Sequence, residues 1–201
     1  EYRPMQCDTL FDIASLAKVV ATTSLLLLAH HEGLCRLDAA LQHFYPQTRE
    51  TPLGSTTVRQ LLAHTGGLAA WWPLYKTLLP DGPACHTTSS AAARRHQAVQ
   101  TILQEPLTYP PGAQTLYSDL GFILLADIVE TCYQQPLDQL FRERVAQPLR
   151  LHCTGYRPLD GPLSLPASPT AYAATETCPW RARVLVGEVH DENAWAMGGV
   201  A

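Results

Sequence analysis

Residues 15–32 constrain the fold of this chain more than any other segment, because a polar head precedes a long apolar run. The run from Val19 to Ala29 contains three hydroxyl side chains and is too short to span a membrane, so it predicts a buried helix. Gly33 follows and suits a left-handed C-terminal cap. With 201 residues, of which 46% are hydrophobic, the chain has enough apolar side chains to surround this helix with a core.

The head of this segment pairs a serine with a lysine three residues later. Residues three apart share one face of an α-helix, so the Ser15 hydroxyl and the Lys18 amine can meet. A serine hydroxyl is a weak nucleophile until a neighbouring base takes its proton. Burial among apolar residues favours an uncharged Lys18 that can act as this base, and free N–H groups at a helix start can bind an oxyanion. In the alternative, Ser15 only caps the helix and Lys18 is solvated.

The remainder of the sequence predicts further helices and very little sheet. Residues 68–95 are rich in Trp, Pro, Ala and Ser, which predicts an irregular stretch serving as a variable loop or lid. We expect residues 1–201 to form a single partial domain. Apolar spacing and turn residues predict helices or helical turns over 15–32, 34–45, 56–63, 96–104, 119–132 and 136–146, a turn at 109–112 and a strand over 182–186.

Charge and cysteine patterns argue against several classes of function. The formal net charge is −4 and the most basic cluster is Arg94-Arg95, so we expect no nucleic-acid partner. Six cysteines without C-x-x-C spacing, and no H-E-x-x-H motif, argue against a metal site. The sequence has no phosphate loop or dinucleotide fingerprint, so we expect no cofactor and a small-molecule substrate. The cellular compartment and the oligomeric state are not indicated.

Four ordered segments carry a family resemblance. Residues 11–18 read F-D-I-A-S-L-A-K, residues 33–38 read G-L-C-R-L-D, and residues 58–68 read V-R-Q-L-L-A-H-T-G-G-L. Residues 109–122 combine Y-P-P-G with Y-S-D-L-G-F. In order and separation these segments resemble the serine β-lactamase and penicillin-binding-protein-like hydrolases, in the branch of class C β-lactamases, D-aminopeptidases and esterases. Four ordered blocks are far more specific than one short motif.

The resemblance implies catalytic roles for three residues. Ser15 matches the acylated nucleophile and Lys18 the general base or proton relay. Tyr117 matches the second-motif tyrosine, whose phenol can move a proton between nucleophile and leaving group. Without the surrounding blocks, Tyr117 would be interpreted as a core tyrosine.

Asp119 departs from the family pattern, which has Asn at this place. The neutral amide of Asn, which both donates and accepts hydrogen bonds, is thereby replaced by a carboxylate, which is normally charged and only accepts them. Asp119 can hold Lys18 protonated and weaken it as a base, or it can suit a different substrate; in either case we expect it in the substrate site. A second register, with Ser118-Asp119 opening an S-D-N motif, is disfavoured because Leu120 occupies the third place.

Three further residues are considered for the substrate site, and for His190 only the resemblance supports that role. His64 precedes the tyrosine motif, so it is expected in a structural turn or pocket wall rather than as a catalytic group. Trp71 is expected to form an aromatic wall over the substrate, with packing beneath the loop as the alternative. His190 lies beside Asp191 and Glu192 and is a candidate substrate contact, with a solvated turn as the alternative.

The family fold implied is α+β, of the β-lactamase/transpeptidase type. No K/H-x-G triplet follows Tyr117 and Ser15 comes early, so we expect a chain truncated at both ends, with the helical subdomain present and most of the terminal antiparallel sheet missing. The implied activity is hydrolysis of an ester, a β-lactam or a D-amino-acid peptide through an acyl-enzyme. The alternatives are a non-catalytic binding or scaffold protein of the same fold, or an inactive fragment.

Overall fold

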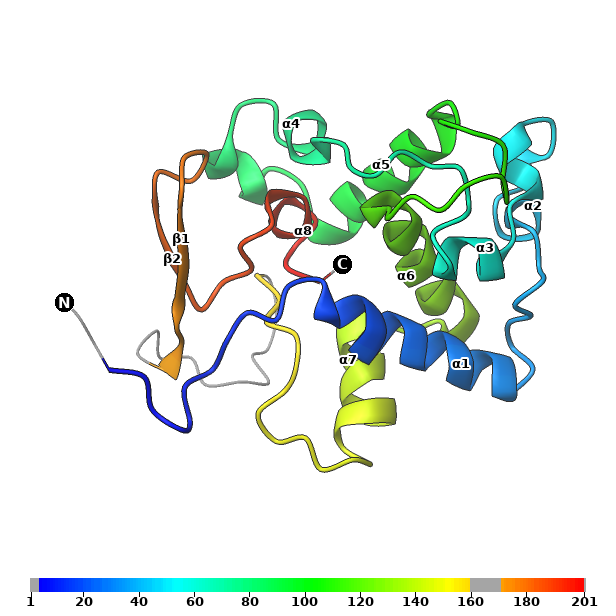
Figure 1. The fold of residues 1–201 in the computed structure, drawn as a ribbon. Helices are drawn as coiled ribbons and strands as arrows, with labels where there is room; N and C mark the ends of the chain where they lie inside the picture. Colours follow the sequence, from blue (N-terminus) through cyan, green and yellow to red (C-terminus); the bar gives the residue numbers. More distant parts are fainter. Residues whose placement is uncertain (1–3, 160–170, 201) are drawn as a thin grey trace.

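The computed structural model describes residues 4–159 and 171–200, and the rest of the expected 1–201 domain lies outside the described residues. The helices gather around one central helix, and a two-stranded sheet lies at one edge of the molecule (Figure 1). The sheet holds the only strands in the described part of the chain, which agrees with the prediction of a mainly helical α+β domain poor in sheet. None of the helices in these residues is long and apolar enough to span a membrane.

The predicted helix over residues 15–32 is confirmed, with one irregularity. The chain is helical from Leu16, widens into a π-helical turn at Lys18–Thr23 and continues as α1, Ser24–His31. Gly33 has φ +77°, the left-handed conformation expected of it. The helix therefore begins beside Ser15 and ends at the predicted glycine.

Two hydroxyl groups stabilise the π-helical turn. Thr23 Oγ1 donates to the Lys18 carbonyl at 2.8 Å, and Ser24 Oγ donates to the Val19 carbonyl at 3.2 Å. These bonds reach five residues back along the chain and satisfy carbonyl groups that the widened turn displaces. The polar residues that interrupt the apolar run thus have a local structural use.

The central helix is α6, Asp119–Tyr133. Ser118 caps its start, because the Ser118 hydroxyl accepts from the Gly121 N–H at 3.2 Å. Gln134 ends it with φ +53°. Helix α6 packs against α1, α3 (Val58–Leu62) and α5 (Ala91–Gln104). The side chains that it buries completely follow helical spacing: Leu124, Leu125, Ile128 and Val129.

The shorter helices agree only in part with the predictions. Thr57 caps α3 through a capping box with Gln60, as the predicted short helix requires. Helix α5 begins at Ala91, earlier than predicted, because Ser90 caps it by accepting from the Ala93 N–H. The other α-helices are α2 (Leu41–Phe44), α4 (Leu74–Leu78), α7 (Leu137–Phe141) with its π-helical continuation Arg142–Ala146, and α8 (Glu192–Ala196).

The prediction of an irregular stretch over residues 68–95 is wrong in part. It contains α4, a 3-10 turn at Pro83–Thr87 and the first turn of α5. Helix α4 forms because Leu74 and Leu78, four residues apart, both enter the core. The many Pro, Ser and Ala residues obscured this short apolar pattern.

The sheet pairs β1, Ala174–Cys178, with β2, Arg183–Val186, in antiparallel register. The predicted strand over residues 182–186 corresponds to β2. Strand β1 was not predicted, since four of its five residues are exposed and it lacks an alternating apolar pattern. Helix α8 was also missed, because five residues are too few for helical periodicity to be recognised.

Candidate active site

Ser15 and Lys18 meet as the sequence predicted. Lys18 Nζ lies 3.1 Å from Ser15 Oγ, within hydrogen-bond distance. Both residues line a cavity of about 250 Å³ between the start of the helix that follows Ser15, the start of α6 and residues 187–191. Ser15 is exposed to this space, so its hydroxyl can reach a substrate carbonyl carbon.

Asp119 forms an ion pair with Lys18, and this pair corrects the expectation of an uncharged amine. Lys18 Nζ lies 2.7 Å from Asp119 Oδ1. Burial lowers the pKa of Lys18. The hydrogen bond and charge of Asp119, together with a smaller contribution from Tyr117, raise it by more than burial lowers it, so the pKa of Lys18 lies above its ordinary value. Of the two interpretations of Asp119, the structure favours the one in which it holds Lys18 protonated.

Tyr117 and His64 lie beside this ion pair. The ring centroid of Tyr117 is 5.4 Å from Lys18 Nζ and 4.5 Å from the His64 ring. His64 Nδ1 accepts from the Ser118 N–H at 3.0 Å, so His64 holds the tyrosine segment in place. Burial, together with the Lys18 charge, lowers the pKa of His64 and favours its neutral form. His64 thus occupies the structural position expected from its sequence context.

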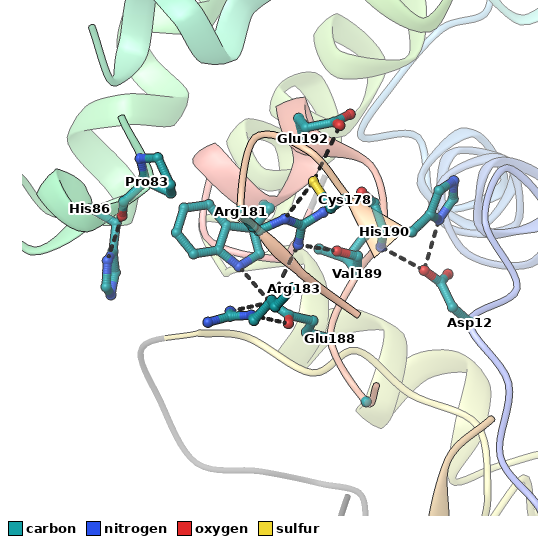
Figure 2. Close-up of polar contacts among 12 residues, drawn as sticks. Asp12, Pro83, His86, Cys178, Arg181, Arg183, Glu188, Val189, His190 and Glu192 are labelled. Atoms are coloured by element: carbon teal, nitrogen blue, oxygen red, sulfur yellow. Dashed lines mark hydrogen bonds and ion pairs between the residues drawn. The ribbon is translucent and has the colours of Figure 1, made fainter. Parts of the chain in front are cut away.

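The two remaining candidates lie in different places. Trp71 is 46% exposed and is not among the described residues that line the cavity. His190 lies on the cavity wall and contacts Asp12, three residues before Ser15. Its Nδ1 is 2.9 Å from Asp12 Oδ2, and its backbone N–H donates to the same oxygen at 2.8 Å. Figure 2 shows the Asp12 carboxylate pointing at the His190 ring.

Two residues that were not predicted as site residues shape the far side of the cavity. Asp191 caps α8 by accepting from the Ala194 N–H at 2.7 Å, and burial raises its pKa. Buried Asn193 ties α8 to α4 through the Trp72 carbonyl and the Tyr75 N–H. These partners of Asn193 lie over one hundred residues away along the chain, so no motif spacing could reveal them.

A second cluster of polar residues lies around Arg181, whose side chain is 1% exposed (Figure 2). Arg181 donates to the carbonyls of Val189 and His190 and pairs with Glu188. Glu188 also accepts from Arg183 and from the Trp195 indole. The guanidinium therefore fixes the backbone of the segment that carries His190.

One group of possible metal ligands occurs in the described part of the chain. Ligand atoms of Glu176, Cys178 and Glu192 lie within 4.8 Å of one another. The guanidinium of Arg181 also contacts this group, with Nε 3.4 Å from Cys178 Sγ. Because that positive charge disfavours a cation, we assign no metal to the group.

Known proteins resemble this chain along nearly its whole length. The family model described as Beta-lactamase matches residues 1–197. The chain is 33% identical to a "Putative D-alanyl-D-alanine carboxypeptidase" of Escherichia coli (strain K12), covering 96% of this chain and 46% of that protein. It is 30% identical to an N-acetylmuramyl-L-alanine amidase of Bacillus subtilis (strain 168), covering 98% and 46%.

Solved structures share the fold. A penicillin binding protein from Bacillus halodurans superimposes with a TM-score of 0.68 at 22% identity, covering 98% of this chain and 56% of that one. A D-alanine carboxypeptidase AmpC from Burkholderia cenocepacia gives a TM-score of 0.65 at 20% identity, covering 98% and 47%. The chain thus spans about half the length of the relatives that it matches.

Proposed function

The chain belongs to the Beta-lactamase family, and from this premise we propose that it is the nucleophile-bearing part of a serine hydrolase in which Ser15 is acylated. The observation that carries the proposal is the 3.1 Å contact between Ser15 Oγ and Lys18 Nζ at the edge of the cavity. Among the described residues none accepts a hydrogen bond from the Ser15 N–H, which leaves this group able to bind the oxyanion of a tetrahedral intermediate.

In the proposed reaction, Ser15 Oγ forms a bond to the carbonyl carbon of the substrate. The hydroxyl proton passes to the Lys18 and Tyr117 pair, and that pair returns a proton to the leaving amine or alcohol as its bond to carbon breaks. Water then attacks the acyl group and restores Ser15 by the reverse proton movements. Lys18 must lose its own proton before it can accept one, so the ion pair with Asp119 sets the pH at which the reaction starts.

As the substrate class we propose a D-amino-acid peptide of cell-wall type, and the name of one relative supports this choice. One relative is named as a D-alanyl-D-alanine carboxypeptidase and another as an N-acetylmuramyl-L-alanine amidase. Both names describe cleavage of an amide bond. Carboxylic esters and β-lactams present the same carbonyl to Ser15, and they serve as the competing substrates in any comparison of rates.

Covalent labelling tests the proposal. We expect an alkyl fluorophosphonate or a labelled penicillin to modify the protein at Ser15, with the site identified by peptide mass spectrometry. Ser15→Ala should abolish the label, whereas Ser55→Ala, at an exposed serine outside the cavity, should leave it unchanged. Folded protein whose Ser15 stays unmodified at every pH would contradict a hydrolase.

The Lys18–Asp119 ion pair also favours a second candidate, a binding or scaffold protein that keeps the fold without catalysis. A lysine held charged cannot accept the serine proton. Ester turnover across a range of pH separates the two functions. Turnover that rises as Lys18 loses its proton supports the hydrolase, and a flat background rate supports the binding protein.

A further inference from the structure

The nucleophile follows a residue in an unusual backbone conformation. Ala14 has φ +49°, a left-handed conformation that L-residues with a Cβ atom rarely adopt. Such a conformation persists only where neighbouring contacts enforce it. The identity and position of those contacts therefore decide where the Ser15 hydroxyl points.

Asp12 supplies one of these contacts from within the same turn. Its Oδ1 accepts from the Ala14 N–H at 2.8 Å. Three short-range backbone bonds continue the turn into the helix, from Leu16 to Ile13, from Ala17 to Ala14 and from Lys18 to Ser15. By themselves, local bonds fix the shape of the turn but not its position in the molecule.

The second oxygen of Asp12 fixes that position. Asp12 Oδ2 accepts from both the backbone N–H and the imidazole of His190, which is 178 residues further along the chain. Figure 2 shows both contacts converging on one carboxylate. Burial raises the pKa of Asp12, but hydrogen bonds from Ala14 and His190 lower it below its ordinary value, so the carboxylate is charged near neutral pH.

The His190 end of this contact is itself rigid. Arg181 donates to the carbonyls of Val189 and His190, with the Val189 bond at 2.7 Å, and its guanidinium lies over the Trp195 ring at 5.5 Å. A buried guanidinium with several acceptors holds a backbone segment more firmly than a solvated turn would. Asp12 is thus bonded to the nucleophile turn on one side and to a fixed wall on the other.

We propose that Asp12 is a positioning residue for Ser15, which it holds against the cavity by joining the strained Ala14 turn to His190. This inference rests on the proposed function for its catalytic consequence but not for its structural one. A shift of about 1 Å in a nucleophile can cost on the order of a hundredfold in rate, so the effect should be measurable.

Two measurements on the full chain test the proposal separately. Hydrogen exchange, followed by mass spectrometry of the peptide spanning residues 12–18, should be at least tenfold faster in Asp12→Ala than in the unaltered chain. Exchange in α6 should be unchanged. Equal exchange at residues 12–18 in both proteins overturns the positioning role, whether or not Ser15 is ever acylated.

Acylation by a fluorophosphonate gives the second measurement. We expect Asp12→Ala to lower the maximal rate at least tenfold while the half-saturating concentration changes less than twofold. Asp12→Asn should recover a large part of the rate, because the amide oxygen still accepts from Ala14, and His190→Ala should give an intermediate loss.

Asp38→Ala is the matched control, since Asp38 is an exposed carboxylate that pairs with Arg36 far from the cavity lining. It should change neither exchange at residues 12–18 nor the acylation rate. If no protein is acylated while exchange still responds to Asp12→Ala, the hydrolase proposal fails and the positioning role stands. If acylation is normal in Asp12→Ala, the positioning role fails and the hydrolase proposal stands.

Discussion

The nucleophile region, residues 11–23, and the C-terminal region, residues 171–200, face each other across one cavity but are held in different ways. The first takes its local shape from contacts three to five residues apart, such as that between Ser15 and Lys18, and packs on α6. In the second, polar contacts of two buried side chains, Arg181 and Asn193, fix the backbone. One cavity is therefore lined by a region whose local shape follows from short sequence motifs and by a region whose backbone depends on long-range polar contacts.

The largest expected effect tests whether Arg181 holds the C-terminal region. Arg181→Met should lower the free energy of unfolding by about 3 kcal/mol, because it breaks the buried side of the ion pair with Glu188 and removes the donor to the Val189 and His190 carbonyls. Arg183→Met is the control: Arg183 pairs with the same Glu188 but is 56% exposed, so its loss should cost less than about 1 kcal/mol. Urea unfolding measures both, and equal losses would contradict the contrast.

The next effect concerns the nucleophile region. Asp119→Asn removes the charge that raises the pKa of Lys18 and leaves the burial that lowers it, so the pKa should fall. Each unit of decrease makes the uncharged amine about tenfold more abundant below the pKa. We expect acylation of Ser15 at pH 7 to rise about tenfold and the rising limb of the pH profile, which follows deprotonation of Lys18, to move to lower pH. An unchanged profile would show that Lys18 does not limit the reaction.

A smaller effect tests whether local capping stabilises the motif-bearing side. Thr57→Ala removes half of the capping box of α3, the helix that leads to His64, and should cost about 1 kcal/mol. The control is Thr101 within α5, whose hydroxyl donates to a carbonyl of its own helix. Thr101→Ala should change the free energy of unfolding by less than about 0.5 kcal/mol. Thermal unfolding of the two variants measures the difference. A loss of stability no larger for Thr57→Ala than for Thr101→Ala would contradict a stabilising role of the Thr57 cap.

The smallest effect lies at the contact between the regions. The lowered pKa of Asp12 means that its charged form stabilises the folded state at pH above its ordinary value of 3.8, and this contribution is lost as pH falls through the lowered value. We expect the Tm difference between the unaltered chain and Asp12→Asn to be largest near neutral pH and to shrink below pH 3.8. A difference that stays constant with pH would show that the charge of Asp12 is not involved.

Sequence patterns predicted the nucleophile region well, because its structure depends on neighbours along the chain. The Ser15 and Lys18 spacing and, outside this region, the Gly33 cap and the α6 periodicity each express a rule that operates within one or two helical turns. The charge of Lys18 was predicted wrongly. It depends on Asp119, about one hundred residues away, and two opposing effects on a pKa cannot be ranked before their distances are known.

The C-terminal region was largely unpredictable for the same physical reason. Arg181 acts through backbone carbonyls, which every residue has and no sequence pattern marks. Asp12 stood within a recognised motif, yet its partner His190 could be identified only once the chain was folded. Short elements such as β1 and α8 lack the length at which periodicity becomes a signal.

The π-helical turn at Lys18–Thr23 has a consequence for how insertions and deletions would be tolerated. One residue of a regular α-helix corresponds to a rotation of about 100°, and a π-helical turn accommodates one additional residue without rotating the remainder of the helix. Deleting a single residue there, after Lys18, should therefore restore the regular pitch without rotating the head of the helix, so that Leu25 and Leu26 stay in the core. The two ends of this helix should thus remain in phase without the surplus amino acid, and a frame-preserving loss of one codon should leave the protein folded with Ser15 still at the cavity.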